Sequence, residues 1–471
     1  MQHARLARLD GRLLMLGFGS IGQGVLPLLL RHLEIDPGRI TILTRGRGGR
    51  AQAVAQGVAF HAETVTADNL EDLFARHLKA GDFLLNLSYG VSSLAALDWC
   101  QRHAVGYLDA CIEPWAGAHE TPAIPPERRS NYAYREAALA LRRQTGQAPT
   151  AVINHGVNPG LVSHFVKRAL RQLAQDAGLG EVEPSGQAGW ASLARDLGVR
   201  AIHIAERDTQ VTFRPKRPGE FVNTWSAEAF IGEACQPAEL GWGTHERHFP
   251  PDGVRHATGA GAAIWLRRPG AATRVRSWTP LAGPYHGFLI THAESVSIAD
   301  FLTLREGSEV VYRPTVHYAY HPCDDAVLSL HELAGRNWQP QTSNRLLMDD
   351  LVEGVDELGV LLLGHVRTAY WYGSRLSLEQ ARALAPCNNA TTLQTAAGVL
   401  AGVVWALNHP GRGIVEPDEL DHEAVLAAAE PYLGEMVGVY GDWTPLSGRG
   451  RLFPEEMDGE DPWQFVNARV T

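Results

Sequence analysis

Short apolar runs alternate with amphipathic segments along the first third of the chain. Turn-bounded apolar runs predict strands at residues 12–17, 39–44, 57–65, 82–88, 104–110 and 150–156. The segments between them carry helical spacing of apolar positions and predict helices at 21–34, 68–80, 92–103 and 128–144. Strand, helix, strand at this spacing is typical of βαβ units. We therefore expect an α/β fold that begins with a Rossmann-type, doubly wound parallel sheet.

The pattern changes after about residue 157. Alternating stretches at 291–304 and 309–320 predict antiparallel strands of a second, mixed α/β domain, and a strongly apolar segment at 392–409 predicts a helix. We expect three regions with soft boundaries. They are a dinucleotide-binding domain at 1–157, a mixed α/β substrate and dimerisation domain at 158–391, and a C-terminal helix with loops at 392–471 that packs back on the other two.

The turn after the first predicted strand carries the motif GFGSIGQG. Glycines at this spacing allow a tight turn and a close approach of the backbone to a pyrophosphate, which binds at the free N–H groups of the following helix. Because the motif stands at the start of repeated βα units, it predicts a dinucleotide site. The residues expected to form it are Gly17, Phe18, Gly19, Ser20, Ile21 and Gly22.

The end of the second predicted strand bears on the choice between NAD and NADP. An acidic residue at this place would bind the ribose 2′-hydroxyl, but the chain has Thr44, Arg45 and Arg47. Arginines suit a 2′-phosphate, which leaves NADP open, although they also fit a solvated loop in which Thr44 binds the ribose. We expect NAD. Other strand ends predict the nicotinamide end of the site or ordinary turns, at Asn86, Leu87, Ser88, Asp109, Asn158 and Pro159.

The charge and the cysteine content limit the classes of binding partner and the cell compartment that we expect for this chain. With 42 basic and 52 acidic residues the net charge is −10, which disfavours nucleic acid and anionic membranes and mildly favours cations. The apolar runs are too short for a signal peptide or a membrane span. Five scattered cysteines fit a reducing cytoplasm. We expect no metal, because the prolines around His317 and His321 argue against a helix that would align the two rings.

The segment 203–243 combines acidic and aromatic side chains, and includes Trp225 and Trp242. Indole faces and carboxylates are the groups that hold an organic cation. The other interpretation is a half-buried helix with a solvated acidic face. The six carboxylates of the segment are Glu206, Asp208, Glu220, Glu228, Glu233 and Glu239.

A dinucleotide beside such a segment indicates redox chemistry on an amine. This chemistry needs carboxylates for ammonium groups, a base and the exclusion of water. Trp225 could stabilise an iminium cation. His292 could move a proton, or it could be an ordinary core histidine. The carboxylates expected to hold ammonium groups are Glu206, Glu233, Glu294 and Asp356.

Motifs spread over essentially the whole chain resemble those of bacterial homospermidine synthases, whose fold is similar to that of saccharopine dehydrogenases. The motifs are GFGSIGQG, SNYAYRE, NHGVNPGLVS, IHIAERDTQ, FVNTWSAEAF, QPAELGWGT, RVRSWTP, HYAYHPCDDAVLSLHE, DELGVLL, AYWYGS and GVYGDWTPL. The resemblance implies redox-neutral aminobutyl transfer with NAD as a prosthetic group. Two putrescines, or spermidine and putrescine, would give sym-homospermidine and release ammonia or diaminopropane, through an imine and a Schiff base.

The resemblance also implies roles for individual residues in a cytoplasmic homodimer. Trp225 would steer iminium intermediates, and Glu206 and Glu233 would anchor ammonium groups, which returns Asp208, Glu220 and Glu228 to a structural role. The residues near the reacting carbon would be Asn158, Glu113 and His292. The chain departs from its relatives at two places: Thr44 and Gly90 stand where they tend to carry acids, which affects the cofactor preference and one amine contact.

Two other functions remain open on the sequence. A saccharopine or carboxynorspermidine dehydrogenase would consume NAD(P)H while reducing a Schiff base, and would need arginines for a substrate carboxylate. A non-catalytic sensor of polyamines or dinucleotides would bind without turnover.

Overall fold

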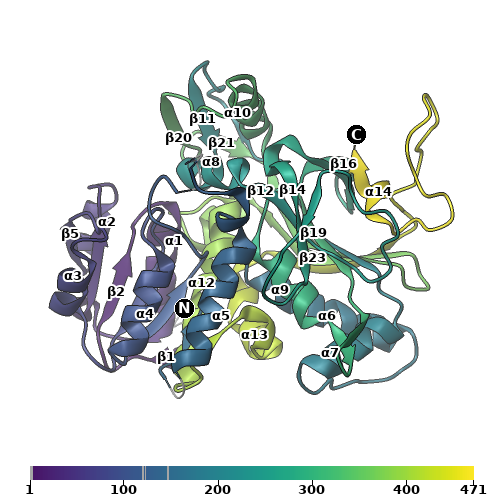
Figure 1. Cartoon of the computed structure of the whole chain (residues 1–471). Coiled ribbons are helices and arrows are strands. Elements are labelled where there is room, and N and C mark those ends of the chain that lie inside the picture. Colours follow the sequence, from purple (N-terminus) through teal and green to yellow (C-terminus); the bar gives the residue numbers. More distant parts are fainter. Residues whose placement is uncertain (1–3, 119–120, 122, 146–147, 471) are drawn as a thin grey trace.

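The computed structural model describes residues 4–118, 121, 123–145 and 148–470 (Figure 1). Its first unit is a seven-stranded sheet in which every neighbouring pair is parallel. The strands in spatial order are β24 (Ile414–Val415), β8 (Ala151–Val152), β7 (Gly106–Asp109), β6 (Phe83–Asn86), β2 (Leu13–Leu16), β4 (Ile40–Thr44) and β5 (Ala59–Ala62). The chain order reverses at β2, which is the switch point of a doubly wound sheet.

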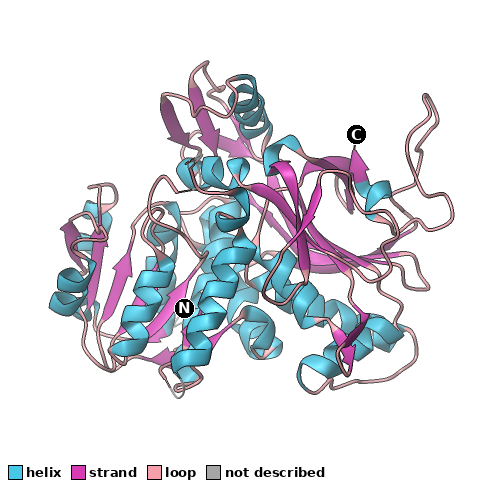
Figure 2. Ribbon diagram, viewed as in Figure 1, coloured by secondary structure: helices cyan, strands magenta, loops and turns pink. Residues whose placement is uncertain are grey.

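Helices cover both faces of this sheet (Figure 2). The central strands β2 and β6 are buried along their whole length, because each presents apolar side chains to both layers. One face packs on α1 (Ser20–His32), α2 (Arg50–Ala55) and α12 (Ala390–Asn408). The other packs on α3 (Leu70–His77), α4 (Ser93–Arg102) and α5 (Asn131–Thr145). The expectation of a Rossmann-type parallel sheet is confirmed.

The C-terminal part of the chain returns to this first sheet. The predicted helix at 392–409 is present as α12, which packs along α1 and β7. Strand β24 then pairs with β8 and extends the sheet by one strand. Within the described residues, α12 is long and apolar enough to cross a membrane, but 89% of its apolar window is buried inside the protein.

A large mixed sheet forms the second unit. Its central strand β9 (Ala201–Asp208) lies parallel to β19 (Thr315–His321) and antiparallel to β22 (Val355–Leu363). The remaining strands are β13 (Gly253–Arg255), β14 (Ala263–Pro269), β12 (Pro237–Gly241), β23 (Ala369–Ser377), β25 (Glu435–Gly441), β15 (Arg274–Thr279), β16 (Gly283–Phe288) and β26 (Arg469–Val470). The prediction of a second, mixed α/β domain is confirmed.

One predicted strand of this domain is wrong. The stretch 291–304 forms helix α9 (Ala293–Phe301), which packs on β12 and β19 beside α6 (Leu161–Asp176). The stretch 309–320 does form strands, β18 (Glu309–Tyr312) and β19. Every residue from Ala293 to Ala299 is buried, so the helix lacks the polar face that produces a helical periodicity.

A small subdomain stands beside the mixed sheet, at the top of Figure 1. In it β11 (Glu220–Asn223) pairs with β20 (Ser343–Leu346), and β10 (Val211–Thr212) pairs with β21 (Leu351–Glu353). Helices α8 (Ala227–Cys235) and α10 (Asp324–Gly335) pack against β11. This subdomain carries Trp225, Glu228 and Glu233 toward the first sheet.

Candidate active site

A cavity of about 690 Å³ opens at the carboxyl ends of the parallel strands, at the switch point beside β2. Residues of both units line it, from the glycine-rich turn to the start of α8. Its volume is in the range of ligand pockets, and its place is the one at which open α/β sheets bind their ligands.

The glycine-rich turn fits a dinucleotide. Gly17 has φ of 87°, and a Cβ there would lie 2.6 Å from the carbonyl oxygen of Leu87. At Gly19, by contrast, a Cβ would meet nothing within 4 Å. No side chain caps the N-terminus of α1, so its first N–H groups face the cavity without a protein acceptor from the cap. This open cradle at a helix N-terminus suits a pyrophosphate.

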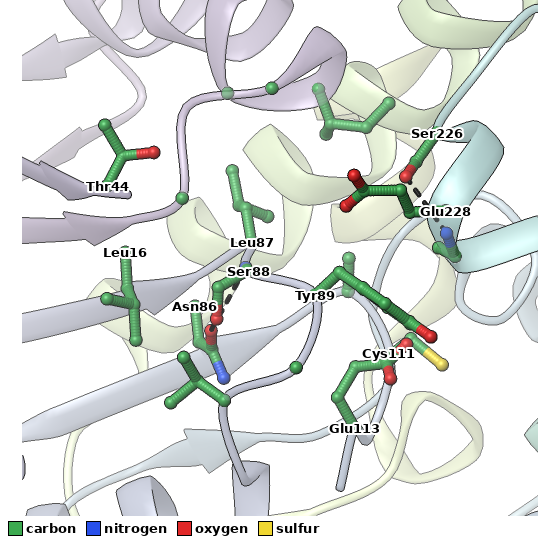
Figure 3. Close-up of a pocket in the computed structure, with 18 of the residues that line it drawn as sticks. Leu16, Thr44, Asn86, Leu87, Ser88, Tyr89, Cys111, Glu113, Ser226 and Glu228 are labelled. Atoms are coloured by element: carbon green, nitrogen blue, oxygen red, sulfur yellow. Dashed lines mark hydrogen bonds between the residues drawn. The ribbon is translucent and has the colours of Figure 1, made fainter. Parts of the chain in front are cut away.

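The neighbouring strand ends complete this part of the wall (Figure 3). The carboxamide oxygen of Asn86 accepts hydrogen bonds from the backbone N–H of Ser88 at 3.2 Å and from its hydroxyl at 2.6 Å, which fixes the turn after β6. Arg45 forms an ion pair with Glu228 of α8. Both side chains are largely exposed, so this pair joins the two units at the mouth of the cavity.

Most of the predicted site residues lie on the wall of this one cavity. They are Gly17, Phe18, Gly19, Ser20, Ile21, Gly22, Thr44, Arg45, Asn86, Leu87, Ser88, Glu113, Asn158, Pro159, Glu206, Trp225, Glu233 and His292. Three others do not line it, and each is fully buried behind the wall: Asp109, Glu294 and Asp356.

Asp109 supports the wall from behind. Its carboxylate accepts hydrogen bonds from the backbone N–H of Asn154 at 2.6 Å and from the hydroxyl of Tyr107 at 2.7 Å. Burial raises its pKa to about 6. Asp109 therefore anchors the loop that carries Asn158, and its expected contact with the cofactor stays a prediction.

Glu206 lies at the inner end of the cavity, on β9. The amide of Asn158 donates to its Oε2 at 2.9 Å, and the hydroxyl of Tyr318 donates to the same oxygen. Asp208 on the same strand and Asp356 on β22 lie behind it, as paired residues of the two strands. Burial raises the pKa of Glu206 to about 8, and it also raises those of Asp208 and Asp356.

His292 stands on the opposite side of the site, at the residue before α9. Its Nε2 lies 3.1 Å from Glu233 Oε2, and its Nδ1 lies 3.2 Å from Glu294 Oε1. Burial lowers the pKa of His292, but the charges of Glu294 and Glu233 outweigh it and hold the pKa well above the ordinary value. The imidazole is thus held as a cation, with one carboxylate facing the cavity and one behind.

Trp225 precedes α8 and is partly exposed to the cavity. Its Nε1–H donates to the hydroxyl of Tyr320 at 3.2 Å, and its ring packs against Phe230 with centroids 5.2 Å apart. These contacts fix the indole at the wall. An aromatic face held in this way can stabilise a cation in the cavity.

Glu113, Cys111 and Tyr89 also line the cavity and are seen below Glu228 in Figure 3. Gly90, next to Tyr89, has φ of 81°, and a Cβ there would lie 2.9 Å from the Cβ of Ala116. The backbone at this place therefore favours glycine, which gives the departure at Gly90 a structural reason. An acidic side chain would require the turn to shift.

The sign of the charges distinguishes the two ends of the cavity. Among the described residues that line it, Arg45 is the one arginine, no lysine is present, and Arg45 is neutralised by Glu228. The inner part is lined by Glu113, Glu206 and Glu233 around His292. Such a site suits a substrate with ammonium groups, and the one cationic group among the described residues of its inner part, His292, is already flanked by Glu233 and Glu294.

Several residues of the cavity wall were not predicted from the sequence, among them Tyr318 and Glu228. Tyr318 was read only as part of a strand, and Glu228 was returned to a structural role, as were Asp208 and Glu220. Glu220 does pair with Arg345 away from the cavity. The side-chain alternation of β19 could have placed Tyr318 and Tyr320 on one face. No group of three metal-ligating side chains is found in the described part of the chain.

Two protein-family models together match most of the chain. That of the saccharopine dehydrogenase NADP-binding domain matches residues 13–153, and that of the saccharopine dehydrogenase C-terminal domain matches residues 156–442. The chain is 53% identical to the homospermidine synthase of Blastochloris viridis over 98% of both proteins. It is 49% identical to that of Mesorhizobium japonicum, over 98% of this chain and 97% of the relative.

Solved structures agree with these matches. The homospermidine synthase of Legionella pneumophila, crystallised in complex with NAD, superposes with a TM-score of 0.92 at 50% identity over 98% of each chain. The apo saccharopine dehydrogenase (L-Glu forming) of Saccharomyces cerevisiae superposes with a TM-score of 0.51 at 11% identity, over 91% of this chain and 100% of that one, and shares the fold alone. The resemblance predicted from the sequence motifs is confirmed: the chain belongs to the homospermidine synthase family.

Proposed function

We propose that the enzyme joins two putrescine molecules, or spermidine and putrescine, into sym-homospermidine and releases ammonia or diaminopropane. The observation that carries this proposal is the inner cavity, in which carboxylates surround His292 without an arginine for a substrate carboxylate. The likeness to the Legionella enzyme with NAD supports NAD as the cofactor, held by the open turn around Gly19. The enzyme would act in the cytoplasm as a homodimer.

When bound, NAD would supply the acceptor for a hydride from the carbon beside one amine and the donor that reduces the later Schiff base, so the reaction would be redox-neutral. The chain would hold the diamine by its ammonium groups, with Glu206 and Asn158 on one side and Glu233 and Glu113 on the other. Each such ion pair contributes roughly 4 kcal/mol before desolvation at about 4 Å and an effective dielectric constant near 20. Trp225 would face the cationic iminium carbon between them.

His292 would accept and return the proton of the reacting amine. An amine must lose a proton before its carbon gives up hydride, and the leaving ammonia must gain one. The imidazole is held between Glu233, which lines the cavity, and Glu294 behind it. This relay would pass a proton between the amine and the buried carboxylate of Glu294.

Incubation of the purified enzyme with putrescine and a catalytic amount of NAD tests the proposal. We expect homospermidine and ammonia to form in equal amounts, measured by chromatography and an ammonia assay, with no net change in absorbance at the wavelength of NADH. Consumption of one cofactor per product would instead indicate a dehydrogenase of the saccharopine type. Diamine binding without any product would indicate a sensor.

A further inference from the structure

Tyr318 occupies the centre of the inner site, between its two groups of charged residues. It lies on β19, next to β9, and its side chain is buried but lines the cavity. On one side its hydroxyl donates to Oε2 of Glu206. On the other side its ring lies 4.7 Å from the ring of His292, measured between centroids. Tyr318 thus contacts both halves of the diamine site.

The orientation of this phenol is fixed by its neighbours. Its ring stacks on that of Tyr320 with centroids 5.2 Å apart and an angle of 9° between the planes. Tyr320 in turn accepts the hydrogen bond from Trp225. Because the rings of Tyr320 and His292 both pack against that of Tyr318, they hold its hydroxyl toward Glu206. The bond to Glu206 is therefore built into the packing of β19.

The bond from Tyr318 determines which oxygen of Glu206 is left for a ligand. Asn158 and Tyr318 both donate to Oε2, so Oε1 is the atom that remains for an ammonium group. A hydrogen bond to a carboxylate also favours its ionised form, against the burial that favours the neutral one. The bond thus affects both the direction and the charge of this carboxylate.

We propose that Tyr318 is a positioning residue of the diamine site, which holds Glu206 in the orientation and ionisation state needed to bind a substrate ammonium. This inference rests on the proposed function, since it assumes that a diamine occupies the inner cavity. Tyr318 acts through Glu206, and its phenol transfers no proton to the substrate.

Several groups set the charge of Glu206 together with Tyr318. Burial and the negative charge of Asp208 favour the protonated acid, while the hydrogen bonds from Tyr318 and Asn158 and the cation at His292 favour the carboxylate. Loss of the phenol hydroxyl removes one of the few stabilising interactions, so the pKa of Glu206 rises above its value of about 8. The titratable groups that face Glu206 are Asp208, Asp356, His292, Tyr285, Tyr318 and Tyr320.

The test measures the dissociation constant of putrescine by calorimetry between pH 6.5 and 9.5, with the enzyme loaded with NADH, which cannot accept a hydride from the diamine. For Tyr318→Phe we expect binding about tenfold weaker at pH 8, and the pH at which binding reaches half its maximum to move upward by about one unit. In Glu206→Gln, binding should be weak and should vary less with pH. Adding Tyr318→Phe to Glu206→Gln should cause no further loss.

Tyr312→Phe is the matched control. Tyr312 is also buried, and its hydroxyl donates to the backbone carbonyl of Val199 at 2.8 Å, away from the cavity. Its loss costs one buried hydrogen bond but should leave putrescine binding and its pH midpoint unchanged. Melting temperature and NAD affinity report whether each variant is folded.

Three results would overturn the role of Tyr318: unchanged putrescine binding in Tyr318→Phe, a weakening that is equal at every pH, or a full additional loss in the Glu206→Gln background. The binding measurement is independent of turnover. If the wild-type enzyme binds putrescine but forms no homospermidine, the proposed function fails while the role of Tyr318 is still tested.

Discussion

Trp225 combines a hydrogen bond and an open aromatic face, and substitution can separate the two. Both Trp225→Phe and Trp225→Ala remove the bond from Nε1 to Tyr320, but only the alanine removes the ring. A cation over an aromatic face gains about 0.5–2 kcal/mol, which corresponds to roughly 2- to 30-fold in rate. We expect kcat with putrescine to fall further in Trp225→Ala than in Trp225→Phe, by a factor in this range of about 2 to 30.

Steady-state kinetics of the two variants, with melting temperatures alongside, check this expectation. Equal losses in both would mean that the indole serves through its hydrogen bond or through packing on Phe230, and that no cation meets its face. A loss confined to KM would place Trp225 in ground-state binding of the diamine.

At the scale of single residues, the sequence could predict site residues that lie close together along the chain. Glu206, Trp225 and Glu233 fall in one short acidic and aromatic segment, and all three line the cavity. Tyr318 could not be found in this way, because its partner Glu206 lies 112 residues away and on another strand. Nor could the sequence tell that Glu294 and Asp356 stand behind the wall, since burial depends on the packing of α9 and β22.

The turn before α1 allows a paired test at the scale of one element. A methyl group at Gly17 would meet the carbonyl of Leu87 at 2.6 Å and would require a positive φ, whereas a methyl group at Gly19 would meet no protein atom within 4 Å. We expect Gly17→Ala to lower the melting temperature by at least about 1–2 °C, because strain at such a position costs about 1 kcal/mol or more and the close contact with Leu87 adds to it.

Gly19→Ala should leave the melting temperature of the apoenzyme unchanged but weaken NAD binding at least tenfold, because its methyl group projects into the space of the pyrophosphate. Thermal unfolding and titration with NAD measure the two effects. NAD binding by Gly19→Ala as tight as that of the wild type would mean that the pyrophosphate does not approach this residue.

Some helices and strands could be predicted from the pattern of apolar positions, and others could not. Strands β2, β4, β6 and β7 could be predicted because each is a short apolar run that ends in a turn. The sequence pattern predicts a strand where helix α9 lies. Because α9 is buried on all sides, its sequence lacks the 3.6-residue periodicity of apolar positions that identifies a helix. Strand β24 has two residues, too few for any pattern, and only the edge of β8 makes it a strand.

At the scale of the whole molecule, the ion pair between Arg45 and Glu228 connects the two units beside Thr44, the strand end that we expect to bind the ribose. Glu228 neutralises Arg45 and places a negative charge where a 2′-phosphate would otherwise find a cation. We expect Glu228→Gln to reduce the preference for NAD over NADP. Because both side chains are largely exposed, the change should be about two- to fivefold, equivalent to about 0.5–1 kcal/mol, and smaller at high salt.

Dissociation constants of NAD and NADP for the wild type and the variant, at two salt concentrations, measure this effect. Glu71→Gln is the control, because Glu71 pairs with Arg102 on the surface and does not line the cavity. An NAD to NADP ratio in Glu228→Gln that equals that of the control would show that Glu228 takes no part in the choice of cofactor.

The division of the chain into 1–157, 158–391 and 392–471 stays a prediction, but the path of the chain gives it a physical context. Residues of the third region enter both sheets: β24 joins the first, and β25 and β26 join the second. A sequence pattern describes only neighbours along the chain. It can therefore predict that a segment packs back on earlier domains, as expected here for α12, but not which strand it will meet.

The return of α12 and β24 to the first sheet has a consequence for synthesis on the ribosome. The dinucleotide fold is encoded mostly at the start of the chain, yet the helix that packs along α1 is translated only near the end. Until then, the side of α1 that packs against α12 has no covering layer, and β8 has an open edge. The nascent chain therefore exposes apolar surface and an unpaired strand edge through most of translation. We expect chaperones to bind this half of the enzyme while it is being synthesised.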